Sequence, residues 1–257
     1  FSDGNDLDTE EQLRIMHREF NTVCTQDPDG FERLKYLDNI FVPERAPVYQ
    51  VPGDCRYISS VEFDPEQIYT IYNIRYGYNP INNSYDNAIT VERPDADTYD
   101  PSYVSGVTAE PTAERLWNTA RQLYLRSNKK RSLPKKRSEL RYIANEAGAI
   151  SYLENVMAWQ GARDGETYPL NRVELEHDGD FPKTVGDKYE VAIPGKFSEA
   201  VGIITGVEYD YGQHTKRITA WVRPSVTVEN IIETGTNGLE IIESGDQPYN
   251  IIEEGNV

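Results

Sequence analysis

The sequence contains few cysteines, since only Cys24 and Cys55 occur among its 257 residues. Two thiols cannot build the disulfide framework that stabilises small secreted domains. We therefore expect two reduced structural cysteines, although a single bridge between them stays open because sequence gives no geometry. No apolar run approaches the length of a membrane-spanning helix, and no signal peptide opens the chain. Phe1 and Val257 are expected to bound a processed chain or an ordered part of a longer one.

Recognisable catalytic motifs are also missing. The sequence has no GxSxG serine motif, no phosphate-binding P-loop and no GxGxxG dinucleotide fingerprint. The histidines His17, His177 and His214 match no zinc spacing, and His17 with Glu19 and Cys24 is an unconvincing ligand set. The sequence therefore predicts no catalytic, cofactor-binding or metal-binding residues, and no cofactor.

The surroundings of His177 are acidic and could attract calcium. They consist of Glu174, Glu176, Asp178 and Asp180. Because this stretch lacks the spacing of an EF-hand loop, a solvated acidic turn is the favoured interpretation. His214 lies in the turn of a predicted hairpin and is expected to be exposed.

Apolar residues are scarce as well, at 38% of the chain, with a mean hydropathy of −0.66. Eighteen tyrosines partly compensate. Tyrosine combines an apolar ring with a polar tip, so it suits half-wet surfaces and interfaces. This composition favours an extended or assembly-dependent protein over a tightly packed enzyme.

Basic residues are outnumbered, with 26 Lys and Arg against 43 Asp and Glu and a net charge of −17. Such a surface repels nucleic acids and anionic membranes overall. Residues 112–142 are the exception, carrying 10 basic and 2 acidic groups. We call the following residues the basic island: Arg121, Arg126, Lys129, Lys130, Arg131, Lys135, Lys136, Arg137 and Arg141. It could contact nucleic-acid phosphates, but a solvated loop or a patch that meets an acidic neighbouring subunit is favoured.

Periodicity predicts an α+β fold. Residues 201–223 alternate apolar and polar side chains on both sides of a turn containing Gly212, which is typical of a β-hairpin. A similar hairpin is expected at 68–93, with further strands at 31–37, 57–63, 170–176 and 188–193. Helices are predicted at 13–24, 112–126 and 139–159. The first should bury Leu13, Met16, Phe20 and Val23; the last should bury Ile143, Ala147, Ile150, Leu153 and Met157.

A short repeat occupies the end of the chain. Residues 231–235 read IIETG, 241–245 read IIESG and 251–255 read IIEEG. Each unit offers two isoleucines that one strand cannot bury alone, so stacked units or neighbouring subunits are expected. The predicted organisation is a hub-like α+β region at 1–225, with a possible insertion at 112–137. A repeat segment follows at 226–257 and continues into a stalk or a further domain.

The order of these elements resembles tail hub, or tail-tip, proteins of tailed bacteriophages. The resemblance is carried by the opening helix leading into DPDG, by IYNIRYGYNP at 71–80, by VGDKYEVAI at 185–193 and by ITGVEYDYGQHTKRITAWV at 204–222. It covers roughly residues 7–223. It implies a β-rich hub-type domain with antiparallel sheets, hairpins and two or three packed helices. The short β-repeat tail, which the ten-residue period predicts, follows this domain.

The resemblance also implies a function. The expected role is a structural virion protein that is made in the host cytoplasm and forms a symmetric ring, usually a trimer, closing the tail tube. Its expected partners are copies of itself, other tail-tube and baseplate proteins, and DNA in transient passage. Two alternatives stay open: a tail-associated peptidoglycan hydrolase using Glu174, Glu176 and Asp180, or a bacterial surface adhesin.

Overall fold

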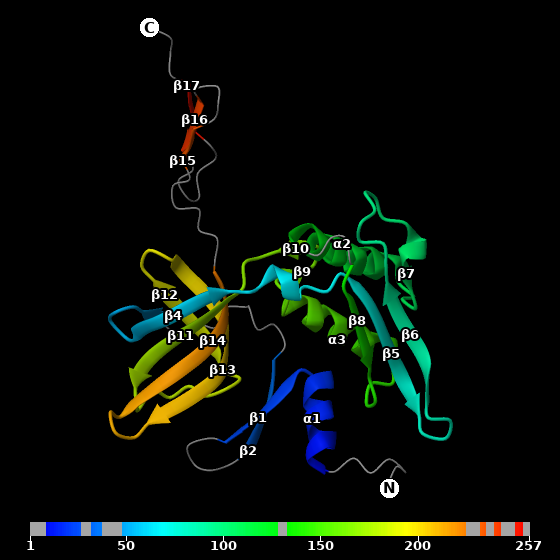
Figure 1. Ribbon diagram of the computed structural model, residues 1–257, viewed down its shortest axis with the longest axis horizontal. Coiled ribbons are helices and arrows are strands. Elements are labelled where there is room, and N and C mark those ends of the chain that lie inside the picture. The colour runs from blue at the N-terminus through cyan, green and yellow to red at the C-terminus, as the bar shows by residue number, and fades with distance from the viewer. Residues whose placement is uncertain are drawn as a thin grey trace.

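The computed structural model describes residues 9–26, 32–37, 48–127 and 133–224, and three tail segments, 232–234, 239–242 and 250–253. Figure 1 shows two β-sheet bodies side by side, the N-terminal elements below them and the tail strands above. The fold is α+β and rich in antiparallel strands, as predicted, with three α-helices in the described parts of the chain. No helix among these residues is long and apolar enough to cross a bilayer.

The first three elements form an arm. They are α1 (Thr9–Glu19), β1 (Thr22–Gln26) and β2 (Glu32–Tyr36). The predicted helix at 13–24 is too long, because Asn21 adopts a positive φ of 48° that ends the helical path. Val23 and Cys24 therefore belong to β1, which pairs antiparallel with the predicted strand β2. The DPDG turn between them lies outside the described residues.

The second part is a helix–sheet body. Its strands are β5 (Ile71–Asn79), β6 (Ser84–Val91), β7 (Val104–Ser105) and β8 (Lys135–Glu139), and its helices are α2 (Glu110–Arg126), α3 (Glu146–Ala158) and the short η1 (Pro65–Gln67) and η2 (Pro101–Tyr103). The sheet order is β7-β6-β5-β8. Tyr72 and Ile74 on one sheet face pack with Trp117 of α2 and Leu153 of α3 in a single buried cluster.

The predicted helix at 139–159 begins too early. Residues 135–139 form β8, which pairs in parallel with β5 (Ile71 opposite Lys135). Because the backbone of Glu139 is already paired in this sheet, the helix cannot begin there. The helix starts at Glu146, where the Asn145 side chain accepts a hydrogen bond from the Gly148 N–H at 2.8 Å. Of the predicted stripe, Leu153 and Met157 are buried, Ile150 is half-buried and Ala147 is exposed; Ile143 is buried but precedes the helix.

The third part is a six-stranded sheet of order β3-β12-β13-β14-β11-β4. The strands are β3 (Tyr49–Gln50), β4 (Arg56–Glu62), β11 (Asn171–Asp178), β12 (Lys188–Ile193), β13 (Phe197–Asp210) and β14 (Thr215–Pro224). The predicted hairpin is confirmed as β13–β14, and its turn residue with positive φ is His214, at 51°. Alternate residues such as Val173, Tyr189 and Ile218 share one buried cluster on its inner face.

The chain passes from the six-stranded sheet to the helix–sheet body and back at one place. β4 ends at Glu62, which pairs with Asn171, the first residue of β11. A third buried cluster there includes Leu170 and Ile203, with Phe63, Trp159 and Trp221 packed against it. The short strands β9 (Ala162–Arg163) and β10 (Glu166–Thr167) complete the return.

The tail repeats form strands. β15 (Ile232–Thr234), β16 (Leu239–Ile242) and β17 (Asn250–Glu253) pair antiparallel in a three-stranded sheet. The predicted boundary at 226 stays a prediction. So does the insertion at 112–137, although Leu116 and Trp117 of α2 belong to the main core of the helix–sheet body.

Candidate functional site

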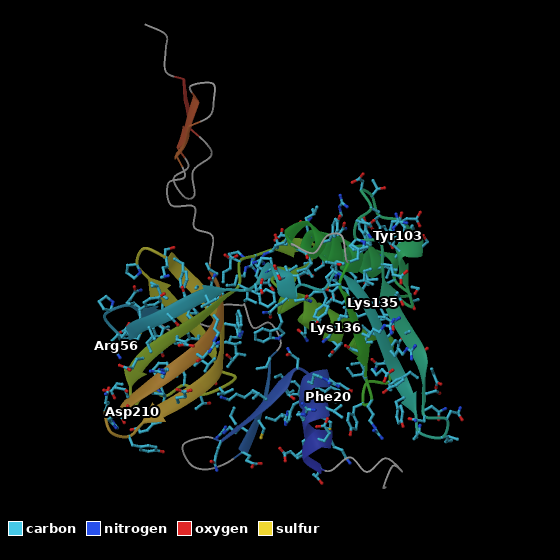
Figure 2. The ribbon with its side chains drawn as sticks, viewed as in Figure 1. Phe20, Arg56, Tyr103, Lys135, Lys136 and Asp210 are labelled. Carbon is cyan, nitrogen blue, oxygen red and sulfur yellow. The ribbon has the colours of Figure 1, made fainter. Side chains whose placement is uncertain are left out.

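A cleft of about 820 Å³ separates the arm from the helix–sheet body. It is within the range of ligand-binding pockets, which are typically hundreds of cubic ångströms and mostly apolar. His17, Arg18, Asn21 and Thr22 line the arm side; the other side includes Phe63, Ile68, Tyr69, Lys136, Tyr152, Val156 and Trp159. Figure 2 labels Phe20 at the end of α1 and Lys136 on the body above it. The site is thus assembled from segments far apart in the sequence.

The buried carboxylate of Glu19 holds α1 against the body. Its two oxygens accept hydrogen bonds from the backbone N–H groups of Arg141, at 2.7 Å, and Tyr142, at 2.8 Å. Burial raises the pKa of the Glu19 carboxyl above its ordinary value, while the two N–H donors act in the opposite direction. Because the ionised carboxylate is the better acceptor, these bonds fix the end of α1 beside the cleft.

Replacing Glu19 with alanine is expected to lower the free energy of unfolding by about 1–3 kcal/mol, because two partly buried N–H groups lose their acceptor. The α1 amides should exchange hydrogen faster, while those of α3 keep their protection, as measured by hydrogen–deuterium exchange. The matched control is Arg14→Ala, because its pair with Glu11 is exposed and should contribute little to stability. Unchanged protection of α1 in Glu19→Ala would show that this contact does not hold the arm.

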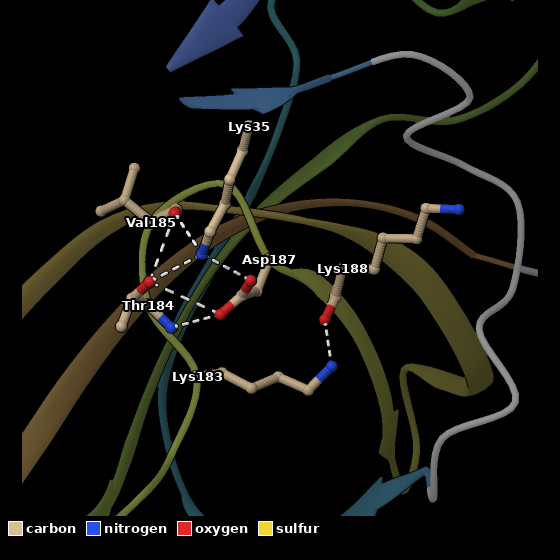
Figure 3. Close-up of polar contacts among 6 residues, drawn as sticks. All are labelled: Lys35, Lys183, Thr184, Val185, Asp187 and Lys188. Atoms are coloured by element: carbon tan, nitrogen blue, oxygen red, sulfur yellow. Dashed lines mark hydrogen bonds and ion pairs between the residues drawn. The ribbon is translucent and has the colours of Figure 1, made fainter. Parts of the chain in front are cut away.

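A second contact joins the arm to the six-stranded sheet. Lys35 Nζ lies 2.6 Å from Asp187 Oδ1 and 2.9 Å from Thr184 Oγ1, as Figure 3 shows. Gly186 in the same turn has a φ of +82°, and a Cβ there would lie 2.5 Å from Val23 Cγ1. Only glycine tolerates both conditions, so the turn and β1 can approach closely. The arm therefore contacts both β-sheet bodies.

The outward side of the arm is apolar and exposed. Leu13 and Met16 of α1, and Phe20 directly after its last residue, are 50%, 38% and 42% exposed. We call these three residues the apolar face of α1. The prediction that they are buried is wrong: the side of the helix that contacts the body carries Glu19 instead. On β2, Leu34 and Tyr36 are also exposed. Exposed apolar side chains gathered on one small element are typical of interaction sites.

The basic island does not form one patch in the described residues. Arg121 donates to the Ala96 carbonyl and Arg126 donates to the Tyr168 carbonyl at 2.7 Å, so both stabilise the fold locally. Lys136 lies over the Tyr69 ring beside the cleft, and Arg141 lies over the Tyr78 ring. Lys129, Lys130 and Arg131 lie outside the described residues.

The remaining island residues lie on the outer face of the four-stranded sheet. A polar hollow of about 220 Å³ there is lined by Asn73, Arg75, Lys135, Arg137, Ser138 and Glu139. Glu139 and Glu92 partly balance its charge, at 3.6 Å from Arg75 and 3.9 Å from Lys135. This mixed hollow is a weak candidate for phosphate binding.

His177 is buried, which the prediction of a solvated turn missed. Its Nε2 lies 2.6 Å from the Tyr189 hydroxyl, and its ring stacks on Phe181 with centroids 3.9 Å apart. Burial lowers the pKa of His177 to about 4, so the ring is neutral at pH 7. The alternation that places Leu175 inward places His177 inward too. Its partner Tyr189 belongs to β12, which is not adjacent to β11 in the sheet, so strand pairing does not predict this contact.

Asp178, Asp180 and His214 are exposed, as expected of an acidic turn. Their ligand-type atoms lie within 4.8 Å of one another. His214 Nδ1 contacts the Tyr209 hydroxyl at 2.5 Å, and its Nε2 lies 3.5 Å from Asp180. Exposed carboxylates often gather without an ion, so the absence of a metal site stays a prediction.

The cysteines are both free, Cys24 exposed and Cys55 buried. Burial raises the pKa of the Cys55 thiol, which makes it a poor nucleophile. Glu174 and Glu176, which the hydrolase alternative requires, pair with Arg172 at 2.8 Å and with Arg56 at 2.8 Å. Neither belongs to the described residues that line the cleft.

Comparison with known proteins gives similar structures but no family. No family model and no curated protein matches the chain. The tail protein from Neisseria meningitidis MC58 is similar with a TM-score of 0.45 and 9% identity, over 86% of this chain and 55% of that one. The 43 kDa tail protein of prophage MuSo2 from Shewanella oneidensis has a TM-score of 0.38 and 9% identity, over 82% and 53%.

The activated baseplate of phage P2 also contains a similar chain, with a TM-score of 0.24 and 10% identity, over 84% of this chain and 53% of that one. The present chain thus spans about half the length of the solved chains it matches. The names of these solved structures are those of tail and baseplate proteins.

Proposed function

We propose that this chain is a structural virion protein of a phage tail tip, in which copies assemble into a closed ring, a trimer, on the tail tube. The observation that carries the proposal is the apolar face of α1, which the monomer leaves exposed. In a symmetric ring such a face becomes buried between subunits. The phage assignment itself comes from the sequence phrases at 71–80, 185–193 and 204–222.

The proposed mechanism is mechanical. The ring closes the tube, contacts other tail-tube and baseplate proteins, and supports host attachment. Loosening of the subunit contacts then lets DNA pass during ejection. With a net charge of −17, a lumen of this chain would repel DNA rather than retain it. No enzymatic step is part of the proposal.

The proposal is tested by light scattering and negative-stain electron microscopy of the purified chain. The wild type should form rings or trimers with a central opening. The double variant Leu13→Asp with Phe20→Asp should fall to the monomer mass of 29.3 kDa, because charges would be buried in the contact. Its matched control is Ile81→Asp, since Ile81 is 90% exposed in the turn between β5 and β6.

The experiment can contradict either the ring or the contact that is proposed to hold it together. A wild type that stays at the monomer mass at every concentration, and that no tail-like particle contains, contradicts the ring. A ring that survives the double variant shows that the apolar face of α1 is not its contact. Circular dichroism of each variant checks that the fold is retained.

A further inference from the structure

The cleft between the arm and the helix–sheet body has an apolar floor and a basic rim. Its floor includes Phe63, Ile68 and Val156. Its rim carries Arg18 of α1 and Lys136 of β8, and Glu66 is the one carboxylate among the described lining residues. In a chain with a net charge of −17, a basic cleft selects a ligand that combines apolar groups with carboxylates.

Two strands that each keep an unpaired edge among the described strands contribute residues to this cleft. β8 ends the order of the four-stranded sheet and pairs with β5 alone among the described strands. β1 likewise pairs with β2 alone. Thr22 of β1 and Lys136 of β8 both line the cleft. Unpaired strand edges bind extended chains through backbone hydrogen bonds, so the geometry favours an extended peptide over a compact ligand.

We propose that the cleft binds the isoleucine- and glutamate-rich repeat, residues 231–255, of a neighbouring copy of this chain. The inference rests on the proposed ring and names a second contact between its subunits, in addition to the apolar face of α1. Each repeat unit places two isoleucines directly before Glu233, Glu243 or Glu253. Isoleucine fits the apolar floor, and each glutamate can pair with Arg18 or Lys136 at the rim.

The position of the repeat in the fold favours binding between copies. Its outer strands β15 and β17 each pair with β16 alone among the described strands, so each keeps one edge that can add to β1 or β8. Figure 1 shows these strands on the opposite side of the molecule from α1. A contact that joins opposite sides of two copies is heterologous, and heterologous contacts generate rings when the rotation closes.

The test measures binding of a fluorescent peptide of residues 229–257 to the full chain by anisotropy. The receptor carries Glu233→Gln, Glu243→Gln and Glu253→Gln, so that its own repeat has no charge at these positions that could pair with either form of the rim. Adding Arg18→Glu and Lys136→Glu to the receptor should weaken peptide binding at least tenfold. Adding Arg137→Glu should not, because Arg137 follows Lys136 on β8 but lines the polar hollow instead.

The reciprocal experiment reverses the charges on the peptide. A peptide with lysine at 233, 243 and 253 should bind the parent receptor weakly and recover on the receptor with Arg18→Glu and Lys136→Glu. Recovery of at least tenfold supports direct pairing, which a misfolded receptor cannot produce. Equal binding of all four combinations overturns the proposal. So does displacement of the peptide by an equal concentration of a single-stranded oligonucleotide, since charge alone would then suffice.

The assembly state separates this inference from the proposed function. If the unaltered chain forms rings but the affinity of the peptide does not depend on Arg18 and Lys136, the proposed ring is retained and the repeat does not bind in the cleft. If the peptide binds as expected while the unaltered chain stays monomeric, the repeat occupies the cleft of its own copy, and binding between copies is overturned.

Discussion

Replacing Trp117 with alanine is expected to lower the free energy of unfolding by about 3–5 kcal/mol. Trp117 is among the largest fully buried side chains and packs at the centre of the helix–sheet body. Its ring contacts Tyr99 and Tyr103, with centroids 5.7 and 6.1 Å away, and its Nε1–H donates to the Arg93 carbonyl at 3.2 Å. The substitution removes this packing and leaves a cavity that the rigid sheet cannot close.

Urea unfolding followed by circular dichroism measures the effect of Trp117→Ala. The matched control is Leu125→Ala on the same helix, because Leu125 is 47% exposed and should change stability by less than about 1 kcal/mol. If the two variants lose the same stability, α2 is not part of the core. That outcome would favour the prediction that residues 112–137 are a peripheral insertion.

Acidification is expected to destabilise the six-stranded sheet through His177. Its pKa is about 4 in the folded chain against 6.5 in the unfolded chain, so the unfolded state binds the proton first. The stability that the neutral ring contributes is fully present above pH 6.5 and is lost as the pH falls toward 4. Since one pKa unit corresponds to about 1.4 kcal/mol, the loss approaches 3 kcal/mol.

The groups around His177 account for the lowering of its pKa. Burial is the main cause of the lowered pKa, Lys216 lowers it slightly, and Asp54 acts in the opposite direction. In the protonated ring both nitrogens can only donate, so the Tyr189 hydroxyl would have to accept from Nε2. His177→Gln keeps an acceptor but cannot titrate, so its stability should depend less on pH between 4 and 6.5.

The measurement is urea unfolding of the wild type and His177→Gln at several pH values. Carboxylates titrate in both proteins, so the difference between the two pH profiles isolates the histidine. Leu125→Ala is the control, because it changes an exposed apolar side chain and removes no titratable group. Parallel profiles for the wild type and His177→Gln would contradict the buried, neutral state of His177.

The elements that sequence predicted well carry their signal locally. The β13–β14 hairpin alternates on both strands around a short turn, and α2 shows a helical stripe of apolar residues. β8 was missed because Lys-Lys-Arg-Ser-Glu has no apolar alternation and its partner β5 lies about 64 positions earlier, Ile71 pairing with Lys135. Parallel pairing of this kind leaves no signal within a short window.

The cleft depends on contacts that sequence does not reveal. Glu19 and Arg141 are 122 positions apart, and neither segment has a sequence pattern that predicts their hydrogen bond. The apolar face of α1 illustrates a related limit. Periodicity established that one face of this helix is apolar, but not whether the same chain covers it. The periodicity therefore predicts burial for a face that the monomer leaves exposed.

The pairing of Glu62 with Asn171 has a consequence for how such a chain can diversify. Everything between these residues leaves the six-stranded sheet and returns to it at neighbouring positions on paired strands. A segment with adjoining ends can be lengthened, shortened or exchanged like a loop, however large it is, while the sheet keeps its register. The interchangeable module of this protein would then lie in the middle of its sequence, and the two flanking halves would form its constant frame.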